Sequence, residues 1–334
     1  MIYRFDDIAY NITTKRVPTP DDNARYIGLE HLDPGELYVK RYGSNVDLKG
    51  DKLVMTKGDI LFGKRNTYLK RVAIAPFDGL FSAHGMIFHP KEDVIDKRYF
   101  PFFINSDAFM DEAIRISVGS LSPTVNWKDL KDLKFDIPPI EEQKQIADKL
   151  WIAYDLKSKY ANLVESIDEM VKSQFIEMFG SRDFLKRLGD YVSVKTGKLD
   201  ANASVEGGRY PFFTCAEKTL SIDTYAFDCN AVLLAGNGEF CVKHYDGKFN
   251  AYQRTYVIES KDESILSTKY LYAWLKDYAN ILKANAIGGV IKYIKLGDII
   301  NAQINLPSQD RQLEYVKIYE QADKSKQIAF SRAS

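Results

Sequence analysis

The stretch DIPPIEEQKQIADKL, from Asp136 to Leu150, marks the point where the sequence changes its pattern. Pro138 and Pro139 suit the first turn of a helix, and the acidic pair Glu141–Glu142 complements the positive end of the helix dipole. Gly180 is a helix-stop residue. These signals predict one helix over 138–180, and roughly forty residues at 1.5 Å each span about 60 Å.

The apolar pattern within 138–180 is that of a heptad seam, because positions spaced alternately by four and three residues are mostly apolar. A long core helix inside a single domain is the alternative. The seam consists of Ile146, Leu150, Ala153, Lys157, Tyr160, Val164, Ile167, Val171, Gln174 and Met178.

The sequence on either side of this helix carries a weak duplication. FSAHGMIFHPK, from Phe81, aligns with FNAYQRTYVIESK, from Phe249, and KGDILFGK, from Lys57, aligns with CNAVLLAGN, from Cys229. Short apolar runs between Gly, Asn, Asp and Pro turns indicate strands. We therefore expect a mixed α and β fold with two similar domains separated by long helices that form an antiparallel coiled-coil pair. The expected boundaries are 1–137, 138–180, 181–306 and 307–334.

The second copy ends like the first, with Pro307, a Ser308 N-cap and the helical pattern QLEYVKIYEQADKSKQIAF. At about 22 residues this helix covers roughly 33 Å, or about half of the central helix. The stretch from Tyr160 to Phe179 is therefore expected to lack a partner within the chain.

Length and composition suit two soluble domains, since 334 residues exceed the usual size of one. Lys plus Arg equals Asp plus Glu at 46 each, so bulk charge cannot drive nucleic-acid binding. There is no apolar run long enough for a membrane span and no apolar core of a signal peptide at the start, so we expect a cytoplasmic protein without membrane contact.

Catalytic and metal-binding motifs are missing from the sequence. None of GxxxxGK[ST], GxGxxG, GxSxG or HExxH occurs. The cysteines, Cys215, Cys229 and Cys241, are too far apart for a CxxC pair, and the four histidines lack metal-ligand spacing. The sequence thus predicts a protein without catalytic residues, metal or cofactor of its own.

Local basic segments with aromatic residues occur at matching places in both copies. Arg, Asn and Gln can read base edges, while Lys, Ser and backbone N–H groups hold phosphates. The turns at Gly119–Ser120 and Gly288–Gly289 would let the backbone approach phosphate closely. Solvated loops are the alternative for each segment and each turn. The candidate DNA-binding residues are Lys64, Arg65, Asn66, Tyr68, Lys70, Arg71 and Ser120 in the first copy, and Asn237, Lys243, His244, Tyr252, Gln253, Arg254 and Lys292 in the second.

The sequence resembles the DNA-specificity (S) subunits of type I restriction-modification systems. The resemblance is carried by the segment from Lys57 to Pro90, by DIPPIEEQKQIADKL with KSQFIEMFG from Lys172, and by NLPSQDRQLEYVKIYEQADKSK from Asn305. It implies two target recognition domains, each reading half of a split DNA site. It also implies helices that set the spacer and dock two modification (methyltransferase) subunits, with restriction (nuclease and translocase) subunits as further partners.

Two departures from the family pattern affect these expectations. Arg311 stands where the first copy has Gln143, and the terminal helix is short, which leaves truncation by gene rearrangement as another reading. We expect a partner subunit or a second copy of the chain to cover the central helix. The expected subunit-interface residues are Ile146, Leu150, Tyr160, Val164, Ile167, Val171, Phe175 and Met178.

Other functions stay open from the sequence. The chain could serve another restriction class or a methylation-only complex, or its two domains could bind protein as a scaffold. Sequence-dependent DNA binding separates the scaffold from the other readings.

Overall fold

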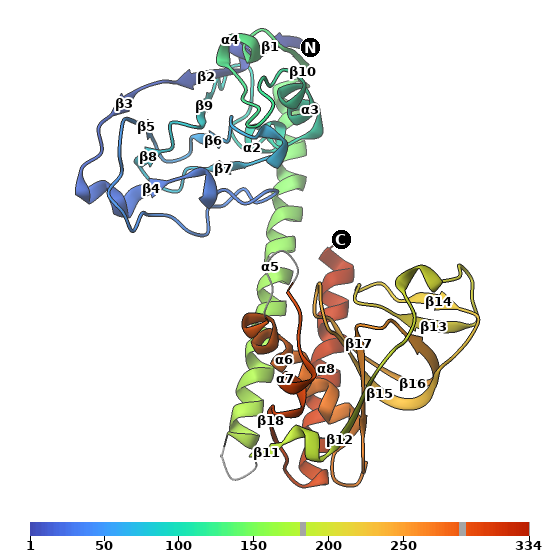
Figure 1. Ribbon diagram of the computed structural model, residues 1–334. Helices are drawn as coiled ribbons and strands as arrows, with labels where there is room; N and C mark the ends of the chain where they lie inside the picture. The colour runs from blue at the N-terminus through green and yellow to red at the C-terminus, as the bar shows by residue number, and fades with distance from the viewer. Residues whose placement is uncertain (181–184, 287–291, 334) are drawn as a thin grey trace. The chain divides into compact units, whose positions relative to one another are not determined.

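The computed structural model describes residues 1–180, 185–286 and 292–333 of the chain. Its internal contacts divide the chain into two compact units, Met1–Leu156 and Lys157–Ser334 (Figure 1). Both units are mixed α and β, so the predicted fold class is confirmed.

The first unit contains two four-stranded sheets and a separate two-stranded ribbon of β1 and β10. The strand orders are β2-β9-β6-β7 and β3-β5-β8-β4, and every pairing is antiparallel except β4 with β8. The strands are β1 (Ile2–Arg4), β2 (Ala9–Ile12), β3 (Lys15–Arg16), β4 (Tyr26–Ile27), β5 (Lys52–Met55), β6 (Ile60–Phe62), β7 (Val72–Ile74), β8 (Gly79–Phe81), β9 (Met86–Pro90) and β10 (Lys134–Asp136). The short helices are α1 (Phe5–Ile8), α2 (Phe100–Ile104), α3 (Asp107–Arg115) and α4 (Trp127–Leu130).

Strand β6 explains why the three residues Ile60, Leu61 and Phe62 are all apolar. Successive side chains of a strand point to opposite faces. Ile60 and Phe62 join one core cluster with the aromatic residues of α2 and α3, whereas Leu61 joins a second cluster on the other face. The strand is therefore covered on both faces, and no position in it tolerates a polar side chain.

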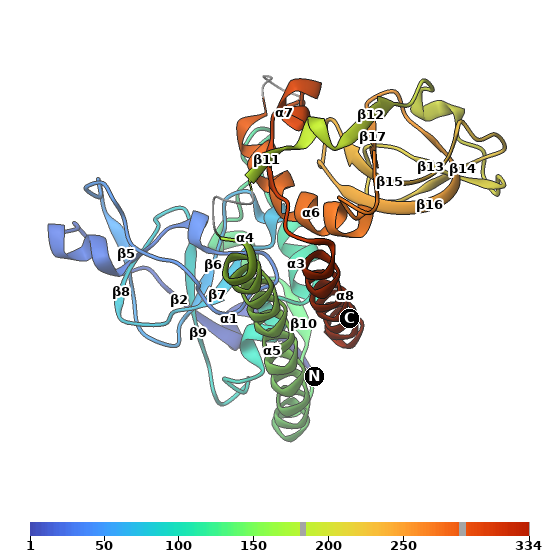
Figure 2. The same ribbon diagram turned by 90° about the horizontal axis from the view of Figure 1, so that it is seen from below.

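The second unit repeats this plan with a six-stranded sheet in the order β12-β17-β15-β16-β13-β14. Its first four strands match β2-β9-β6-β7 in order, and the ribbon of β11 and β18 matches that of β1 and β10. Helix α6 lies between the sheet and α8 (Figure 2). The elements are β11 (Leu185–Arg187), β12 (Val192–Thr196), β13 (Tyr210–Phe213), β14 (Leu220–Ile222), β15 (Phe227–Ala235), β16 (Val242–Ala251), β17 (Thr255–Ser260), α6 (Thr268–Asn285), α7 (Leu296–Ile300), β18 (Gln303–Asn305) and α8 (Gln309–Ala333).

The helix expected after Pro139 is α5 (Ile140–Phe179), which ends before Gly180. Its first half packs on the first unit. Gln143 and Ala147 are buried there, the Trp151 indole Nε1 donates to the Arg98 carbonyl at 2.9 Å, and the Leu37 N–H donates to the Tyr154 hydroxyl at 2.9 Å.

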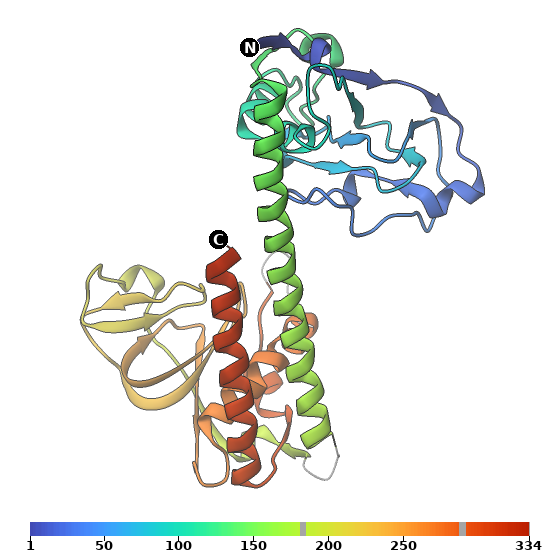
Figure 3. The same ribbon diagram turned by 180° about the vertical axis from the view of Figure 1, so that it is seen from behind.

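The second half of α5 lies antiparallel to α8 (Figure 3). The Lys326 ammonium donates to the Asp168 carboxylate at 2.8 Å, while Tyr315, near the start of α8, contacts the Phe175 and Phe179 rings near the end of α5. This confirms the antiparallel helix pair.

The expectation that Tyr160–Phe179 lacks a partner within the chain is wrong. Val171 is buried, and Ile167, Phe175 and Met178 pack against the core that α6 and α8 build. Pairing of β11 with β18 brings the start of α8 beside the end of α5, so a short antiparallel helix covers the second half of its mate. These four residues therefore belong to the core of the second unit and are not free for a partner subunit or a second copy.

The remaining expected interface residues, Ile146, Leu150, Tyr160 and Val164, are half-buried. Two positions of the predicted seam, Ala153 and Lys157, are exposed. The seam breaks because the two halves of α5 pack on different surfaces, and each half buries its own stripe.

The suspected loss of a glutamine at the start of the second long helix is also wrong. The buried counterpart of Gln143 is Gln312, one residue beyond Arg311. The offset between the copies has grown by one residue at this point, which a repeat aligned at a fixed offset misses.

Candidate nucleic-acid interface

The basic segment of the first unit forms the connection between β6 and β7. The chain leaves β6 at Gly63, and the Gly63 N–H donates to the Arg71 carbonyl at 2.9 Å. Between them, Asn66 and Lys70 adopt left-handed backbone conformations with φ of 55° and 47°, on either side of the short 3-10 turn Thr67–Leu69. These conformations fold the segment into a compact loop, with Arg65 and Tyr68 exposed.

A second segment, Val118–Thr124, packs against this loop. The Asn66 N–H donates to the Pro123 carbonyl at 2.7 Å, and the Val125 N–H donates to the Lys64 carbonyl at 3.0 Å. The Arg65 guanidinium Nη2 also donates to the Ser122 hydroxyl at 3.2 Å. The predicted basic loop and the predicted turn at Ser120, far apart in sequence, thus form one surface.

Helix α3 reduces the positive charge of this surface. The Lys70 ammonium donates to the Asp107 carboxylate at 2.7 Å, which raises the pKa of Lys70, and Asp111 lies 3.9 Å away. A phosphate at Lys70 would have to displace that carboxylate. The segment Lys64–Arg71 contains four cations and no acid, but a helix that begins 37 residues further along the chain neutralises one of them, so Lys70 is a weaker phosphate candidate than the sequence indicated.

Lys64 and Arg71 are half-buried at the base of the loop. Burial, with a contribution from nearby Lys15, lowers the pKa of Lys64. Both lysines line a cavity of about 310 Å³ beside Asn126 and Trp127. The sequence reasoning missed Lys15, Ser122 and Thr124; the SLSPT run around Pro123 is a turn signal that could have pointed to the last two.

The second unit uses the same construction with different side chains. Asn237 forms an isolated β-bridge with Tyr293, as Arg65 does with Thr124, and the Ile294 N–H donates to the Gly236 carbonyl at 2.9 Å. Arg65 and Asn237 therefore occupy equivalent places. Lys292 is exposed next to Tyr293, whereas the Gly288–Gly289 turn lies outside the described residues.

The turn between β16 and β17 joins this end of the sheet. The Gly236 N–H donates to the Arg254 carbonyl at 2.8 Å, and the Gln253 N–H donates to the Leu199 carbonyl at 2.9 Å. Gln253 and Arg254 are exposed, and Tyr252 is half-buried. Asn237, Gln253 and Arg254 thus lie on loops that meet at one end of the sheet.

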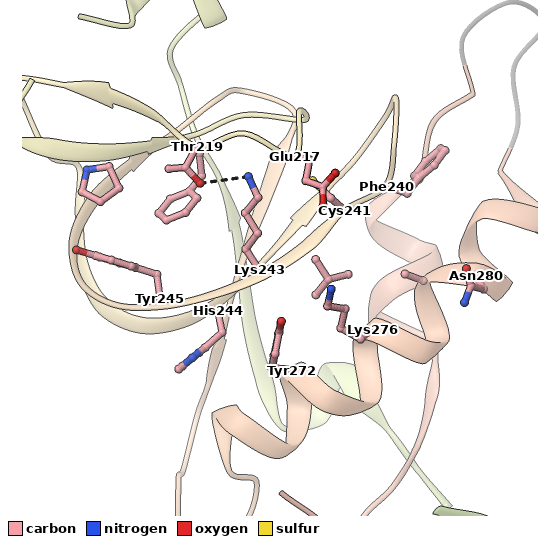
Figure 4. A pocket seen from close by; sticks show the side chains of 14 residues that line it. Glu217, Thr219, Phe240, Cys241, Lys243, His244, Tyr245, Tyr272, Lys276 and Asn280 are labelled. Carbon is pink, nitrogen blue, oxygen red and sulfur yellow. Dashed lines mark hydrogen bonds between the residues drawn. The ribbon is translucent and has the colours of Figure 1, made fainter. Parts of the chain in front are cut away.

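Lys243 and His244 lie apart from those loops, on β16. Together with Lys276, Tyr272 and Glu217, they line a pocket of about 670 Å³ between β16 and α6 (Figure 4). The Lys243 ammonium donates to the Ala216 carbonyl at 2.9 Å. The His244 Nε2 lies 2.7 Å from the Asn230 amide oxygen, and burial lowers the pKa of His244. Strand pairing holds both residues on β16, whereas Arg254 lies in the turn between β16 and β17.

The described part of the chain contains no group of three or more His, Cys, Asp or Glu side chains arranged to hold a metal ion. Over the same residues, none of the helices combines the length and the apolar character that a membrane crossing requires.

The two matched β-rich units and their antiparallel helices are the architecture of a DNA-specificity protein. The family model for the type I restriction modification DNA specificity domain matches residues 2–164 and 185–331, so the chain belongs to that family.

Individual relatives agree with this assignment. The EcoDI specificity subunit of Escherichia coli is 50% identical over 125 residues, which are 37% of this chain and 28% of that protein. The MjaIX specificity subunit of Methanocaldococcus jannaschii is 26% identical over 343 residues, covering 87% of this chain and 76% of that protein. The chain thus matches less than a third of the length of the E. coli relative.

Two solved structures share the fold. The S subunit of the type I restriction-modification system from M. genitalium superposes with a TM-score of 0.64 at 14% identity, covering 100% of this chain and 91% of that one. A chain from a study of complex assembly and conformational transition of the type I R-M system superposes with a TM-score of 0.51 at 18% identity, covering 100% and 92%.

Proposed function

We propose that the chain is the DNA sequence-recognition subunit of a type I restriction-modification complex, in which each unit reads one half of a bipartite site. The observation that carries this proposal is the equivalence of Arg65 and Asn237. Each residue stands in the first connection after a buried central strand and forms the same β-bridge to a second segment.

Arg65 and Asn237 differ in the base that each can recognise, as two different half-sites require. Arginine pairs with the O6 and N7 atoms of guanine, whereas asparagine pairs with the N6 and N7 atoms of adenine. One scaffold with different side chains at one position can therefore read two different sequences. Gln253 and Arg254 add donors and acceptors at the same end of the second sheet.

The catalytic steps belong to partner subunits in this proposal. With equal numbers of acidic and basic residues, the chain has no bulk charge to hold DNA, so modification subunits supply most phosphate contacts and the methyl transfer. Restriction subunits join the same assembly. Residues 1–137 and 181–306 act as the recognition domains, and 138–180 and 307–334 act as the spacer helices.

Because Ile167, Val171, Phe175 and Met178 pack into the core of the second unit, the proposed docking surface for partner subunits lies on the exposed face of α5. Leu163 and Met170, both in the second half of α5, lie within about 20° of each other around an α-helix at 100° per residue, and each is 47% exposed. Apolar side chains exposed together on one helix face are typical of protein contact surfaces. We propose that a modification subunit docks on this face of α5.

The test is to map methylated bases in cells that carry the chain with its modification subunits. A split motif with a constant gap is expected. A gel shift of the purified complex on that motif and on scrambled DNA provides the second readout. Equal binding to both DNAs, with and without modification subunits, would instead favour the protein scaffold.

A further inference from the structure

Leu121 stands out on the surface that Arg65 shares with Val118–Thr124. It is 95% exposed, the highest value among the exposed large apolar residues of the described chain. Single exposed leucines are common and need no explanation by themselves. What distinguishes Leu121 is the conformation of the segment that carries it.

The segment that carries Leu121 is a closed hairpin. The Val118 N–H donates to the Thr124 carbonyl at 3.1 Å, and the Thr124 N–H donates back to the Val118 carbonyl at 2.9 Å. Gly119 supplies the turn with a φ of 113°, a conformation that disfavours any other residue. The major groove of DNA admits a two-stranded β-ribbon, and a hairpin closed by a single bridge is no wider than such a ribbon.

The hairpin is fixed to the residue proposed to read a base. Thr124 forms a β-bridge with Arg65, and the Ser122 hydroxyl accepts a hydrogen bond from the Arg65 guanidinium. The segment from Ala113 to Trp127 contains no acidic residue, so nothing in it repels phosphate. DNA that reaches Arg65 therefore lies next to the hairpin that carries Leu121.

The immediate neighbours of Leu121 favour DNA over protein as the contact. Protein interfaces combine several apolar side chains into a patch, whereas Leu121 stands between Ser120 and Ser122, and the other exposed large apolar side chain of the hairpin, Val118, lies at its base and is 58% exposed. Thymine is the base that presents an apolar group, its 5-methyl, in the major groove. A leucine side chain can contact that methyl group, and it has no donor or acceptor with which to hydrogen-bond to any base.

We propose that Leu121 is a specificity-determining residue that contacts the 5-methyl group of a thymine in the half-site read by the first unit. This inference rests on the proposed function and specifies the base that Leu121 contacts, thymine, and the group on it, the 5-methyl. The second unit offers no described counterpart, because the matching residues fall within 287–291.

The experiment uses the chain assembled with its modification subunits and duplexes carrying its mapped site. Each thymine is replaced singly by deoxyuridine, which removes only the methyl group, and binding is measured by fluorescence anisotropy. At one position of one half-site, the wild-type complex should bind the thymine duplex about fourfold more tightly, the effect of burying one methyl group. The Leu121→Ala complex should bind both duplexes equally. The matched control Ile2→Ala, an exposed apolar residue on β1, should retain the difference.

Several results would overturn the inference while leaving the proposed function intact. They are an unchanged thymine preference in Leu121→Ala, a wild-type complex indifferent to every substitution, and half-sites made of G·C pairs alone. Loss of modification subunits from Leu121→Ala, with its thymine preference unchanged, would assign Leu121 to a protein contact. If the wild-type complex cannot tell its site from scrambled DNA, the proposed function fails and the inference fails with it.

Discussion

Gln143 and Gln312 make the same three hydrogen bonds in the two units. The Gln143 amide nitrogen donates to the Pro138 and Val94 carbonyls at 2.8 and 3.0 Å, and its oxygen accepts from the Asp96 N–H at 2.7 Å. The Gln312 amide nitrogen donates to the Pro307 and Ile265 carbonyls at 2.9 and 2.8 Å, and its oxygen accepts from the Ser267 N–H at 3.0 Å.

Both side chains are fully buried in the first turn of a long helix. Each satisfies two carbonyls and one N–H that would otherwise be buried without partners. Each therefore fixes the point at which a helix leaves its own β-rich unit. If the helices set the spacer as proposed, the same three hydrogen bonds also fix the direction in which each helix leaves its unit.

Removing either amide should destabilise the unit that contains it. We expect Gln143→Ala and Gln312→Ala each to lower the free energy of unfolding by about 3 kcal/mol, because three buried backbone groups lose their partners. Urea unfolding of the full chain measures the change. The exposed neighbours Lys144→Ala and Glu314→Ala are the matched controls, and equal stability of all four variants would refute the assigned role.

Two buried tyrosines should respond in opposite ways to loss of the hydroxyl. The Tyr315 hydroxyl is buried and has no hydrogen-bond partner among the described residues, whereas the Tyr270 hydroxyl donates to the Asn305 carbonyl at 2.8 Å. Burial raises the pKa of both groups, so both hydroxyls stay protonated.

Tyr315→Phe should leave stability unchanged or raise it by about 1 kcal/mol, and Tyr270→Phe should lower it by about 1 kcal/mol. Thermal unfolding monitored by circular dichroism separates the two variants. A Tyr315→Phe protein less stable than Tyr270→Phe would mean that the Tyr315 hydroxyl has a partner after all.

The Arg16–Asp22 pair should make the first unit sensitive to acid. Two hydrogen bonds of 2.6 Å from the Arg16 guanidinium hold the pKa of Asp22 well below its usual value of 3.8. Above that value the carboxyl is ionised in the folded and unfolded states, and the pair contributes its full stability. As the pH falls below 3.8, the unfolded chain takes up a proton first, so stability is lost progressively.

Asp22→Asn removes this titration. Its urea midpoint should fall less steeply than that of the wild type between pH 5 and pH 3, a window of about one unit on either side of the ordinary carboxyl pKa. The Asp33→Asn variant, which breaks an exposed pair with Arg41, is the control for a smaller effect. Parallel pH profiles for wild type and Asp22→Asn would contradict the expectation.

Arg65→Ala should relax recognition at one position of one half-site. Loss of a bidentate contact to guanine costs about 1–3 kcal/mol, and the other half-site should keep its specificity. Anisotropy on duplexes with each base pair changed in turn measures both effects. Arg115→Ala is the matched control, since Arg115 is an exposed arginine of the same unit paired with Glu112. A uniform loss on all sequences would make Arg65 a phosphate contact instead.

Local signals in the sequence determined the long helix, the repeat and the fold class. Proline, acidic residues and glycine bound α5 because helix ends depend on residues within one turn of them. The run GDILFG predicted a strand, because a short apolar run between turn residues is typical of one, whereas the burial of β6 on both faces is known only from the structure.

The tertiary structure alone decided which half of α5 pairs with α8, which charges remain free and which candidate residues share a surface. Asp107 reaches Lys70 from another helix, α8 pairs with α5 because β11 pairs with β18, and Lys243 is held in a pocket by its strand. All three depend on contacts between residues far apart in the chain. Periodicity and spacing describe neighbours along the sequence, and they carry no information on such contacts.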